Sequence, residues 1–184
     1  MQTVGAQFRS DHYEDGYFES MDGSRMHYVA VKNPKDYEAR SNIMWTATWA
    51  LNTLIGLGKK QDWMVHMIGH SVGAWTHAPH GYALASVSMA YYRRAMKNGL
   101  PKFVRFAKNV WNINGDGRTD EQIAEEGLQA LKEWMTEIGL PLTISEVGAT
   151  ADMIPGITET TVVYPAGYLN LSKDDVAEIL KESM

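Results

Sequence analysis

The chain of 184 residues has 45% hydrophobic and 21% charged residues, which is the composition of a globular protein with room for one domain. The net charge is −5, and no cluster of basic residues exceeds the pair Arg93-Arg94, so nucleic acid is excluded as an expected partner. The chain contains no cysteine, which excludes disulfides, thiolate nucleophiles and cysteine-ligated iron–sulfur clusters.

The N-terminal residues 1–33 are polar and interrupted by glycines. We expect a poorly patterned helix over residues 7–20 and either a short strand or a helical turn over residues 26–31. The first seven residues show neither the basic nor the apolar region of a secretory signal. Together with the lack of cysteine, this leads us to expect a cytoplasmic protein.

An apolar helix is predicted next. Asn33 and Pro34 resemble an N-cap followed by a first helical position, and Gly58 is a typical residue after a helix end. The uncharged run over residues 43–57 is shorter than the roughly 18–20 residues of a membrane span, and polar residues dilute it. We therefore predict a buried central helix and no membrane partner.

The rest of the chain predicts further helices. Helical patterns cover residues 62–75, 82–98 up to Gly99, a segment opened by Pro101, 119–139, short pieces near 145 and over 152–161, and 173–182. Thr119 with Gln122 and Ser172 with Asp175 have the spacing of capping boxes. Residues 162–164 suggest a short extended piece. No repeat and no strand–helix alternation occurs, so the predicted fold class is all-α.

Four of the six histidines fall within residues 62–81, namely His66, His70, His77 and His80. His66 and His70 lie one turn apart on the same face of the predicted helix. Imidazole is the commonest protein ligand of transition metals, so the pattern indicates a metal site or a proton relay, although surface or core histidines would give it too. A mononuclear site needs at least three ligands, which Asp62 or a residue from the N-terminal segment would complete.

Residues 69–73 match the G-x-S-x-G pattern of the serine hydrolase nucleophile elbow. That elbow requires a strand before Ser71 and a histidine downstream of it, after the acid. No histidine follows His80, and the preceding residues favour a helix, so a serine hydrolase is a remote alternative. We instead expect Gly69 and Gly73 to mark close packing against another helix.

Residues 112–120 imitate the start of a calcium-binding loop. The twelfth position, where a bidentate glutamate is required, is Ile123, so we expect a surface turn that leads into a helix cap. The chain also lacks a phosphate loop and any G-x-G-x-x-G motif. It therefore offers no dinucleotide site of its own.

The histidine-rich stretch resembles the signature of the iron-containing alcohol dehydrogenases, in particular the butanol-dehydrogenase branch. The signature residues are Asp62-Trp63-x-x-His66-Met67-Ile68-Gly69-His70, followed by His80-Gly81-x-x-Leu84-Ala85. Collinear blocks at residues 33–45, 50–52, 110–113, 139–141 and 145–148 are also similar, and the resemblance covers roughly residues 32–184.

The resemblance implies the helical domain of the dehydroquinate synthase-like, iron alcohol dehydrogenase type, without the N-terminal α/β domain that binds NAD(P). It divides the chain into a divergent, shortened N-terminal segment, residues 1–32, and a helical metal-binding domain, residues 33–184. NAD(P)H would bind through a domain that this chain does not contain.

The resemblance also implies roles for individual residues. His66 and His80 match two ligands of a divalent metal, for which Fe²⁺ is expected and Zn²⁺ is the alternative. His70 matches the catalytic histidine on the proton path from the substrate hydroxyl. His77 matches no functional position.

The remaining ligands in the family are an aspartate and a histidine four residues apart on one helix. His12 matches the histidine and is the third expected metal ligand. The aspartate position, however, is occupied by Phe8. The fourth ligand is therefore missing, or Asp11 replaces it in a shifted geometry.

The implied activity is reversible hydride transfer between a primary alcohol or aldehyde and NAD(P), with little or no activity for this chain alone. The expected partners are a small alcohol or aldehyde and a separate cofactor-binding domain. An exposed hydrophobic face where that domain sits would favour a homo-oligomer. The alternative is a non-catalytic helical module that binds metal or another protein.

Overall fold

The computed structural model describes residues 23–53, 56–58, 60–165 and 167–184. Within these ranges the regular elements are helices: α3 (Gly23–Lys32), α4 (Tyr37–Leu51), α5 (Met64–Thr76), α6 (His80–Trp111), α7 (Asp120–Glu137), η2 (Ser145–Val147), η3 (Ala151–Met153), α8 (Ile154–Thr160) and α9 (Lys173–Glu182). The described residues contain no strand, so the all-α prediction is confirmed, and residues 162–164 form an irregular connection. The helix predicted over residues 7–20 lies outside the described ranges.

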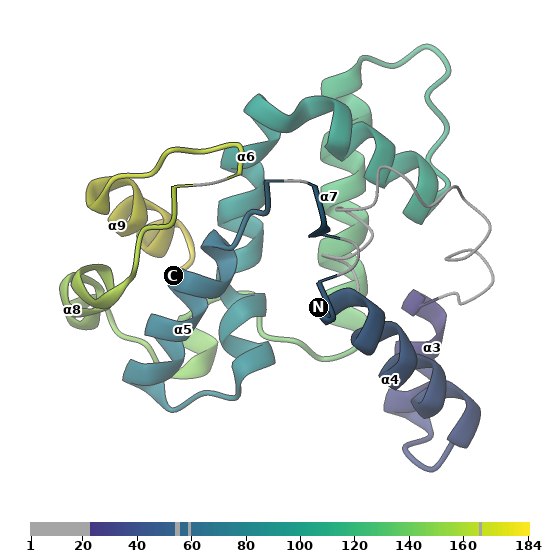
Figure 1. Cartoon of the computed structure of the whole chain (residues 1–184), viewed down its shortest axis with the longest axis horizontal. Helices are drawn as coiled ribbons and strands as arrows, with labels where there is room; N and C mark the ends of the chain where they lie inside the picture. The colour runs from purple at the N-terminus through teal and green to yellow at the C-terminus, as the bar shows by residue number, and fades with distance from the viewer. Residues whose placement is uncertain (1–22, 54–55, 59, 166) are drawn as a thin grey trace.

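Helices α5 and α6 form the centre of the molecule (Figure 1). Helix α7 packs against α6 on one side, and α8 and α9 pack against α5 and α6 on the other. Helices α3 and α4 pack mainly against each other, and the His27 ring of α3 contacts the Trp134 ring of α7, with centroids 5.6 Å apart. The histidine-rich stretch therefore lies on the two helices that α7, α8 and α9 flank.

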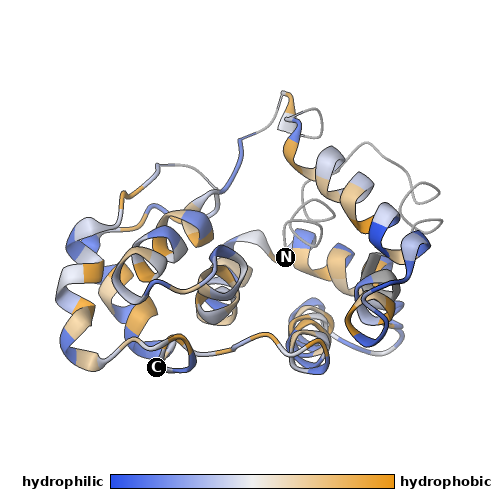
Figure 2. Ribbon diagram, turned by 90° about the horizontal axis from the view of Figure 1, so that it is seen from below, coloured by the Kyte–Doolittle hydropathy of each residue, from blue (hydrophilic) through white to orange (hydrophobic). Residues whose placement is uncertain are grey.

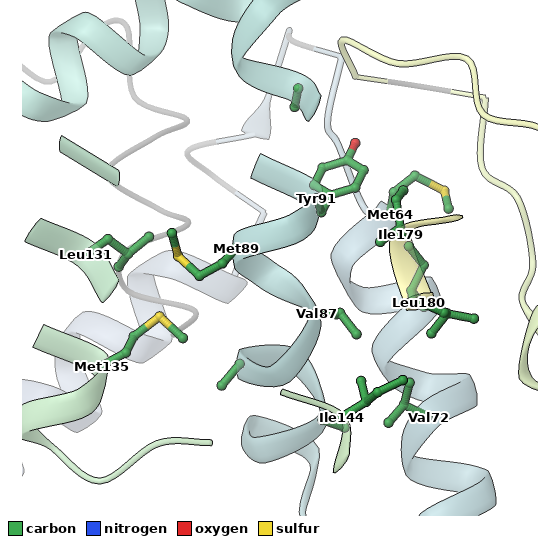
Figure 3. Packing of buried hydrophobic residues seen from close by; sticks show 14 of the residues in the cluster. Met64, Val72, Val87, Met89, Tyr91, Leu131, Met135, Ile144, Ile179 and Leu180 are labelled. Carbon is green, nitrogen blue, oxygen red and sulfur yellow. The ribbon is translucent and has the colours of Figure 1, made fainter. Parts of the chain in front are cut away.

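The hydrophobic core holds this arrangement together (Figure 3). Met89 of α6 points toward Leu131 and Met135 of α7, whereas Val87 points to the opposite side of α6, where Leu180 of α9 lies. All five side chains are buried. Burying a side chain of this size stabilises a fold by about 1.5–3 kcal/mol, so α6 is fixed from both sides.

Helix α6 continues through a kink that the sequence predicts as a boundary between two helices. Gly99 has non-helical dihedral angles (φ −114°, ψ 23°), and Pro101 follows it inside the helix. Proline removes one backbone hydrogen bond and disturbs the preceding turn. A Cβ atom at Gly99 would lie 2.8 Å from the ring of Tyr168, so the kink also provides space for that ring.

The N-terminus of α4 differs from the prediction. Asp36, and not Asn33, is the N-cap, because its side chain accepts a hydrogen bond from the backbone of Ala39 at 2.9 Å. The residues before it form a turn in which the Asp36 N–H donates to the carbonyl of Asn33. The helix ends at Leu51, well before the predicted end at Gly58.

The prediction that this helix is buried and central is wrong. Tyr37 is 85% exposed, Met44 70% and Trp45 50%, while the buried residues of α4 are Ala39, Thr46 and Ala50. Apolar residues lie all around the helix, but only α3 is a major packing partner for it among the described elements. Sequence hydrophobicity shows which residues can be buried, not what is available to cover them.

Figure 2 shows hydrophilic and hydrophobic residues mixed along the helices. Among the described residues, no helix is both long enough and apolar enough to cross a membrane.

Local capping predictions are confirmed. Thr119 and Gln122 form a capping box at the start of α7, and Ser172 and Asp175 form one at the start of α9. In each box the first side chain accepts a backbone N–H and the second reaches back to the cap residue. Helix α9 has the predicted bounds.

The loop that imitates a calcium site is a turn. The Asn114 side chain accepts the backbone N–H of Asp116 at 3.0 Å. Ile123, at the position that would need a glutamate ligand, is only 2% exposed and belongs to the core. This agrees with the prediction of a surface turn leading into the cap of α7.

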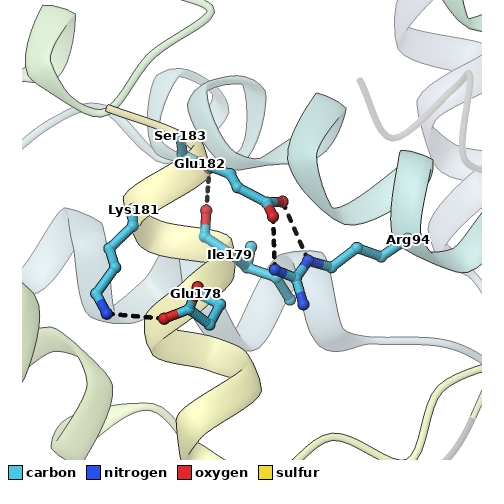
Figure 4. Close-up of polar contacts among 6 residues, drawn as sticks. All are labelled: Arg94, Glu178, Ile179, Lys181, Glu182 and Ser183. Atoms are coloured by element: carbon cyan, nitrogen blue, oxygen red, sulfur yellow. Dashed lines mark hydrogen bonds and ion pairs between the residues drawn. The ribbon is translucent and has the colours of Figure 1, made fainter.

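Helix α9 is fastened to α6 by an ion pair (Figure 4). The Arg94 guanidinium donates from Nε and Nη2 to the two carboxylate oxygens of Glu182, at 3.0 and 2.6 Å. This hydrogen bond to Glu182 raises the pKa of Arg94. The backbone N–H of Ile144 also donates to the Ser183 carbonyl at 2.7 Å, so the C-terminal helix is held at two places.

Glu146 stabilises the connection between α7 and η2. Its Oε2 atom accepts the backbone N–H groups of Leu142 and Thr143, each at 2.8 Å, and the Thr143 hydroxyl at 3.1 Å. These hydrogen bonds, led by the one from Leu142, hold the pKa of Glu146 below its usual value. The carboxylate form therefore favours the folded state.

This arrangement predicts a pH dependence of stability. Because the folded pKa is depressed, the contribution of Glu146 is present above the unfolded value of about 4.3 and is lost as the pH falls through the folded value. We expect Glu146→Gln to lower the urea unfolding midpoint near neutral pH and to make the midpoint less sensitive to acid. Glu137→Gln, at an exposed position of α7, controls for the loss of one surface charge. Parallel pH profiles of wild type and Glu146→Gln would contradict the prediction.

Candidate metal centre

Three of the predicted site residues come together at the junction of α5 and α6. His66 and His70 lie on α5, and His80 is the first residue of α6. The ring centroids are 5.7 Å apart for His66 and His70, 5.3 Å for His66 and His80, and 5.2 Å for His70 and His80. The contact of His80 with the other two rings depends on the hairpin between the helices.

These separations fit imidazoles that share an ion. Two rings bound to one tetrahedral ion through metal–nitrogen bonds of about 2.0–2.1 Å have centroids roughly 5 Å apart. The ring separations do not distinguish His70 from the two histidines that the resemblance assigns as ligands. Within the described residues, no group of three histidine, aspartate or glutamate side chains is arranged to hold a metal ion. His12, the remaining expected ligand, lies outside the described residues.

Glycine on α5 allows the two helices to approach closely. A Cβ atom at Gly69 would lie 2.7 Å from the Leu84 side chain and 3.3 Å from its backbone. At Gly73 the nearest atoms would belong to Ala78 and Ala83, at 3.5 and 3.6 Å. This agrees with the interpretation of the two glycines as a packing surface.

The nucleophile elbow is not formed. Ser71 lies in the middle of α5 and is only 6% exposed, and the residues before it are helical, not a strand. An elbow depends on a sharp strand-to-helix turn that exposes the hydroxyl, so this geometry gives no support to the serine hydrolase alternative.

The ring of His66 is supported by its neighbours on the N-terminal side. The Trp63 ring contacts it edge-on, with centroids 5.0 Å apart. The Trp63 indole N–H donates to the side chain of Gln61 at 3.1 Å, and Gln61 donates to the carbonyl of Gly56 at 3.2 Å. This chain of contacts restricts the orientation of the half-buried His66 side chain.

His77 has a structural explanation. It is the C-cap of α5 in the left-handed conformation (φ 59°, ψ 18°), and its backbone N–H donates to the carbonyl of Gly73 at 2.8 Å. A residue in this conformation ends a helix and redirects the chain. His77 therefore helps to form the hairpin that brings His80 to the cluster.

The electrostatics favour neutral imidazole at His80. Partial desolvation, followed by repulsion from His70, lowers the pKa of His80. Neutral imidazole is the form that binds metal ions. The side chains of His70 and His80 are both exposed to solvent.

Asp62 was a candidate for the missing carboxylate ligand, but its carboxylate has other partners. Oδ1 accepts the backbone N–H of Met64 at 3.0 Å, and Oδ2 accepts the Tyr91 hydroxyl at 2.5 Å. The sequence does not single out Tyr91, because it occupies an ordinary inward position of a helix and only the fold places it beside Asp62.

The fold and the site together define a class of protein: an all-helical domain with clustered imidazoles on two adjacent helices. The chain belongs to the Fe-containing alcohol dehydrogenase family, whose C-terminal family model matches residues 25–184. The resemblance seen in the sequence is thereby confirmed.

Individual relatives agree with this assignment. The chain is 37% identical to the NADPH-dependent aldehyde reductase YqhD of Escherichia coli over 128 residues, which cover 70% of this chain and 33% of that protein. It is 30% identical to the NADH-dependent butanol dehydrogenase A of Clostridium acetobutylicum over 177 residues, 92% of this chain and 45% of that protein.

Solved structures share the fold. The crystal structure of Escherichia coli YqhD matches the whole chain with a TM-score of 0.86 and 27% identity, over 49% of its own length. The NADH-dependent butanol dehydrogenase A of Thermotoga maritima matches 98% of the chain with a TM-score of 0.83 and 27% identity, over 50% of its length. The chain thus spans between 33% and 50% of the length of these relatives.

Proposed function

We propose that this chain supplies the metal-binding helical domain of an NAD(P)-dependent alcohol or aldehyde dehydrogenase. The observation that carries the proposal is the clustering of His66, His70 and His80 at the junction of α5 and α6, with ring centroids 5.2–5.7 Å apart. Membership of the Fe-containing alcohol dehydrogenase family supports it.

In this proposal His66 and His80 hold a divalent ion, Fe²⁺ or alternatively Zn²⁺, together with His12 from the N-terminal segment. When bound, the ion supplies Lewis-acid chemistry toward the oxygen of an alcohol or aldehyde. His70 moves a proton between the site and solvent, a role that suits its exposed position beside the other two rings. The close packing at Gly69 keeps all three side chains on a rigid helix pair.

Hydride transfer requires a nicotinamide cofactor that the protein must orient. The relatives are named as NADPH- or NADH-dependent enzymes, and this chain spans at most half of their length. We therefore assign the cofactor site to a second domain, distinct from the metal-binding part at residues 33–184 and from the segment at residues 1–32 that carries His12. Turnover requires that second domain.

The proposal is tested by loading the purified chain with Fe²⁺ or Zn²⁺ under anaerobic conditions and adding NADH or NADPH with butanal. We expect one ion to bind per chain and no oxidation of the nicotinamide above the rate of a protein-free control. Robust turnover by the chain alone would contradict the need for a second domain. Failure to bind either metal would contradict the proposal as a whole and leave a non-catalytic helical module.

A further inference from the structure

A polar contact joins the first turn of α5 to the middle of α6. The Asp62 carboxylate binds the backbone of Met64 with one oxygen and the hydroxyl of Tyr91, at 2.5 Å, with the other. The Tyr91 side chain is only 1% exposed. The contact therefore links the residue pair before α5 to α6, and it is shielded from solvent on the tyrosine side.

The connection between α8 and α9 closes over this link. A Cβ atom at Gly167 would lie 2.3 Å from Asp62 Oδ2, so the backbone of that connection presses directly on the carboxylate. The Asn98 side chain donates to the Tyr168 carbonyl at 3.0 Å, and the Tyr164 N–H contacts the Met64 sulfur at 3.1 Å. Three segments distant in sequence thus meet at one carboxylate.

The chemistry of the pair makes the link persistent. Burial, followed by the charge of Asp62 and the hydrogen bond to it, raises the pKa of Tyr91, so the hydroxyl remains a donor. A hydrogen bond from a hydroxyl to an ionised carboxylate is short and strong. A partly buried environment strengthens such a hydrogen bond further, because the local dielectric constant is lower than that of water.

We propose that Asp62 and Tyr91 are positioning residues that set the placement of His66 relative to His80. Asp62 lies two residues before the start of α5, His66 is the third residue of α5, and Tyr91 belongs to the same helix as His80. Their hydrogen bond fixes the position of the first turn of α5 on α6, while the close contact at Gly69 fixes the next turn. The proposal rests on the metal-binding function assigned above to His66 and His80.

The test uses Tyr91→Phe, which removes the hydroxyl and retains the buried ring, with two measurements on the full chain. Proton–nitrogen correlation NMR spectra of the metal-free protein report the environment of the histidine rings. Titration with Co²⁺ reports the affinity and, through its absorption bands, the coordination geometry. We expect shifted resonances of His66 and His80, altered Co²⁺ bands and about tenfold weaker Co²⁺ binding, as for other supporting partners of metal ligands.

Asp62→Asn provides a second variant. Its amide retains one oxygen for Met64 or Tyr91, so it should weaken Co²⁺ binding less than Tyr91→Phe does. Ile123→Val truncates a buried residue of α7 and controls for a general loss of stability. It should leave the histidine resonances and the Co²⁺ bands unchanged.

Histidine resonances in Tyr91→Phe that match the wild type would overturn the positioning role, whether or not metal binds. Shifted resonances in a protein whose wild type binds no Co²⁺ would support positioning and contradict the proposed metal function.

Discussion

Replacing His66 or His80 by alanine is expected to weaken the binding of Fe²⁺, Zn²⁺ or Co²⁺ by more than about 100-fold. Substituting a residue that only supports a metal ligand weakens binding by roughly 10–100-fold, and removing a ligand itself should cost more. Each substitution removes one of the two imidazoles that the described residues contribute to the proposed site. Neither side chain belongs to the buried core, so the fold should persist. Isothermal titration calorimetry of the purified variants measures the effect, and circular dichroism verifies that they remain helical.

Substitutions of His70 and His77 test whether the loss of metal binding is specific to His66 and His80. His70→Ala should leave the metal affinity within a few-fold of the wild type, because His70 is assigned to proton movement. His77→Asn should have no effect, because asparagine also tolerates the left-handed conformation at the end of α5. A loss of binding in His70→Ala as large as that in His66→Ala would contradict the assignment of roles, which the ring separations alone do not settle.

Gly127→Ala is expected to destabilise the fold by about 1–2 kcal/mol. Gly127 lies in α7 where it crosses α6, and an added Cβ atom would lie 2.6 Å from the Ala107 Cβ and 3.0 Å from its Cα. Backbone atoms cannot move aside cheaply, and overpacking of this kind costs about 1–3 kcal/mol. The higher helix propensity of alanine offsets only about 0.5–1 kcal/mol of that cost. Urea unfolding of the two proteins measures the difference.

The same substitution at Gly81 is the matched control. Gly81 lies in the first turn of α6, and an added Cβ atom would meet no other atom within 4 Å. Gly81→Ala should therefore leave stability unchanged or raise it by up to about 1 kcal/mol. Equal changes in stability at the two positions would show that helix propensity, and not the packing of α7 on α6, decides the result.

Features that depend on neighbours in sequence were predictable. The capping boxes at Thr119 and Ser172 and the bounds of α9 follow from hydrogen bonds or dihedral preferences within a few residues. At Gly99 the sequence predicts a boundary between two helices, and the structure has a kink there. The spacing of His66 and His70 likewise predicts that they lie together, because one helical turn separates them.

The candidate site was predictable only in part. His80 was assigned beside His66 through a family resemblance, and the structure brings their rings to 5.3 Å through the hairpin that His77 helps to form. Asp62 was considered as a metal ligand, whereas its carboxylate binds Tyr91, 29 positions away. Nothing in the local pattern of either residue indicates that partner. His12 remains a prediction, because it lies outside the described residues.

The sequence by itself determined the helical class, most helix ends and the family, because periodicity, caps and motif spacing act over short stretches of chain. The tertiary structure decided which helices are covered. Helix α4 is as apolar as a core helix, yet Met44 and Trp45 are exposed, whereas α6 is enclosed between α7 and α9. It also decided that Asp62 binds a tyrosine. Burial and interhelical hydrogen bonds depend on which distant surfaces meet, and composition within one helix does not specify that.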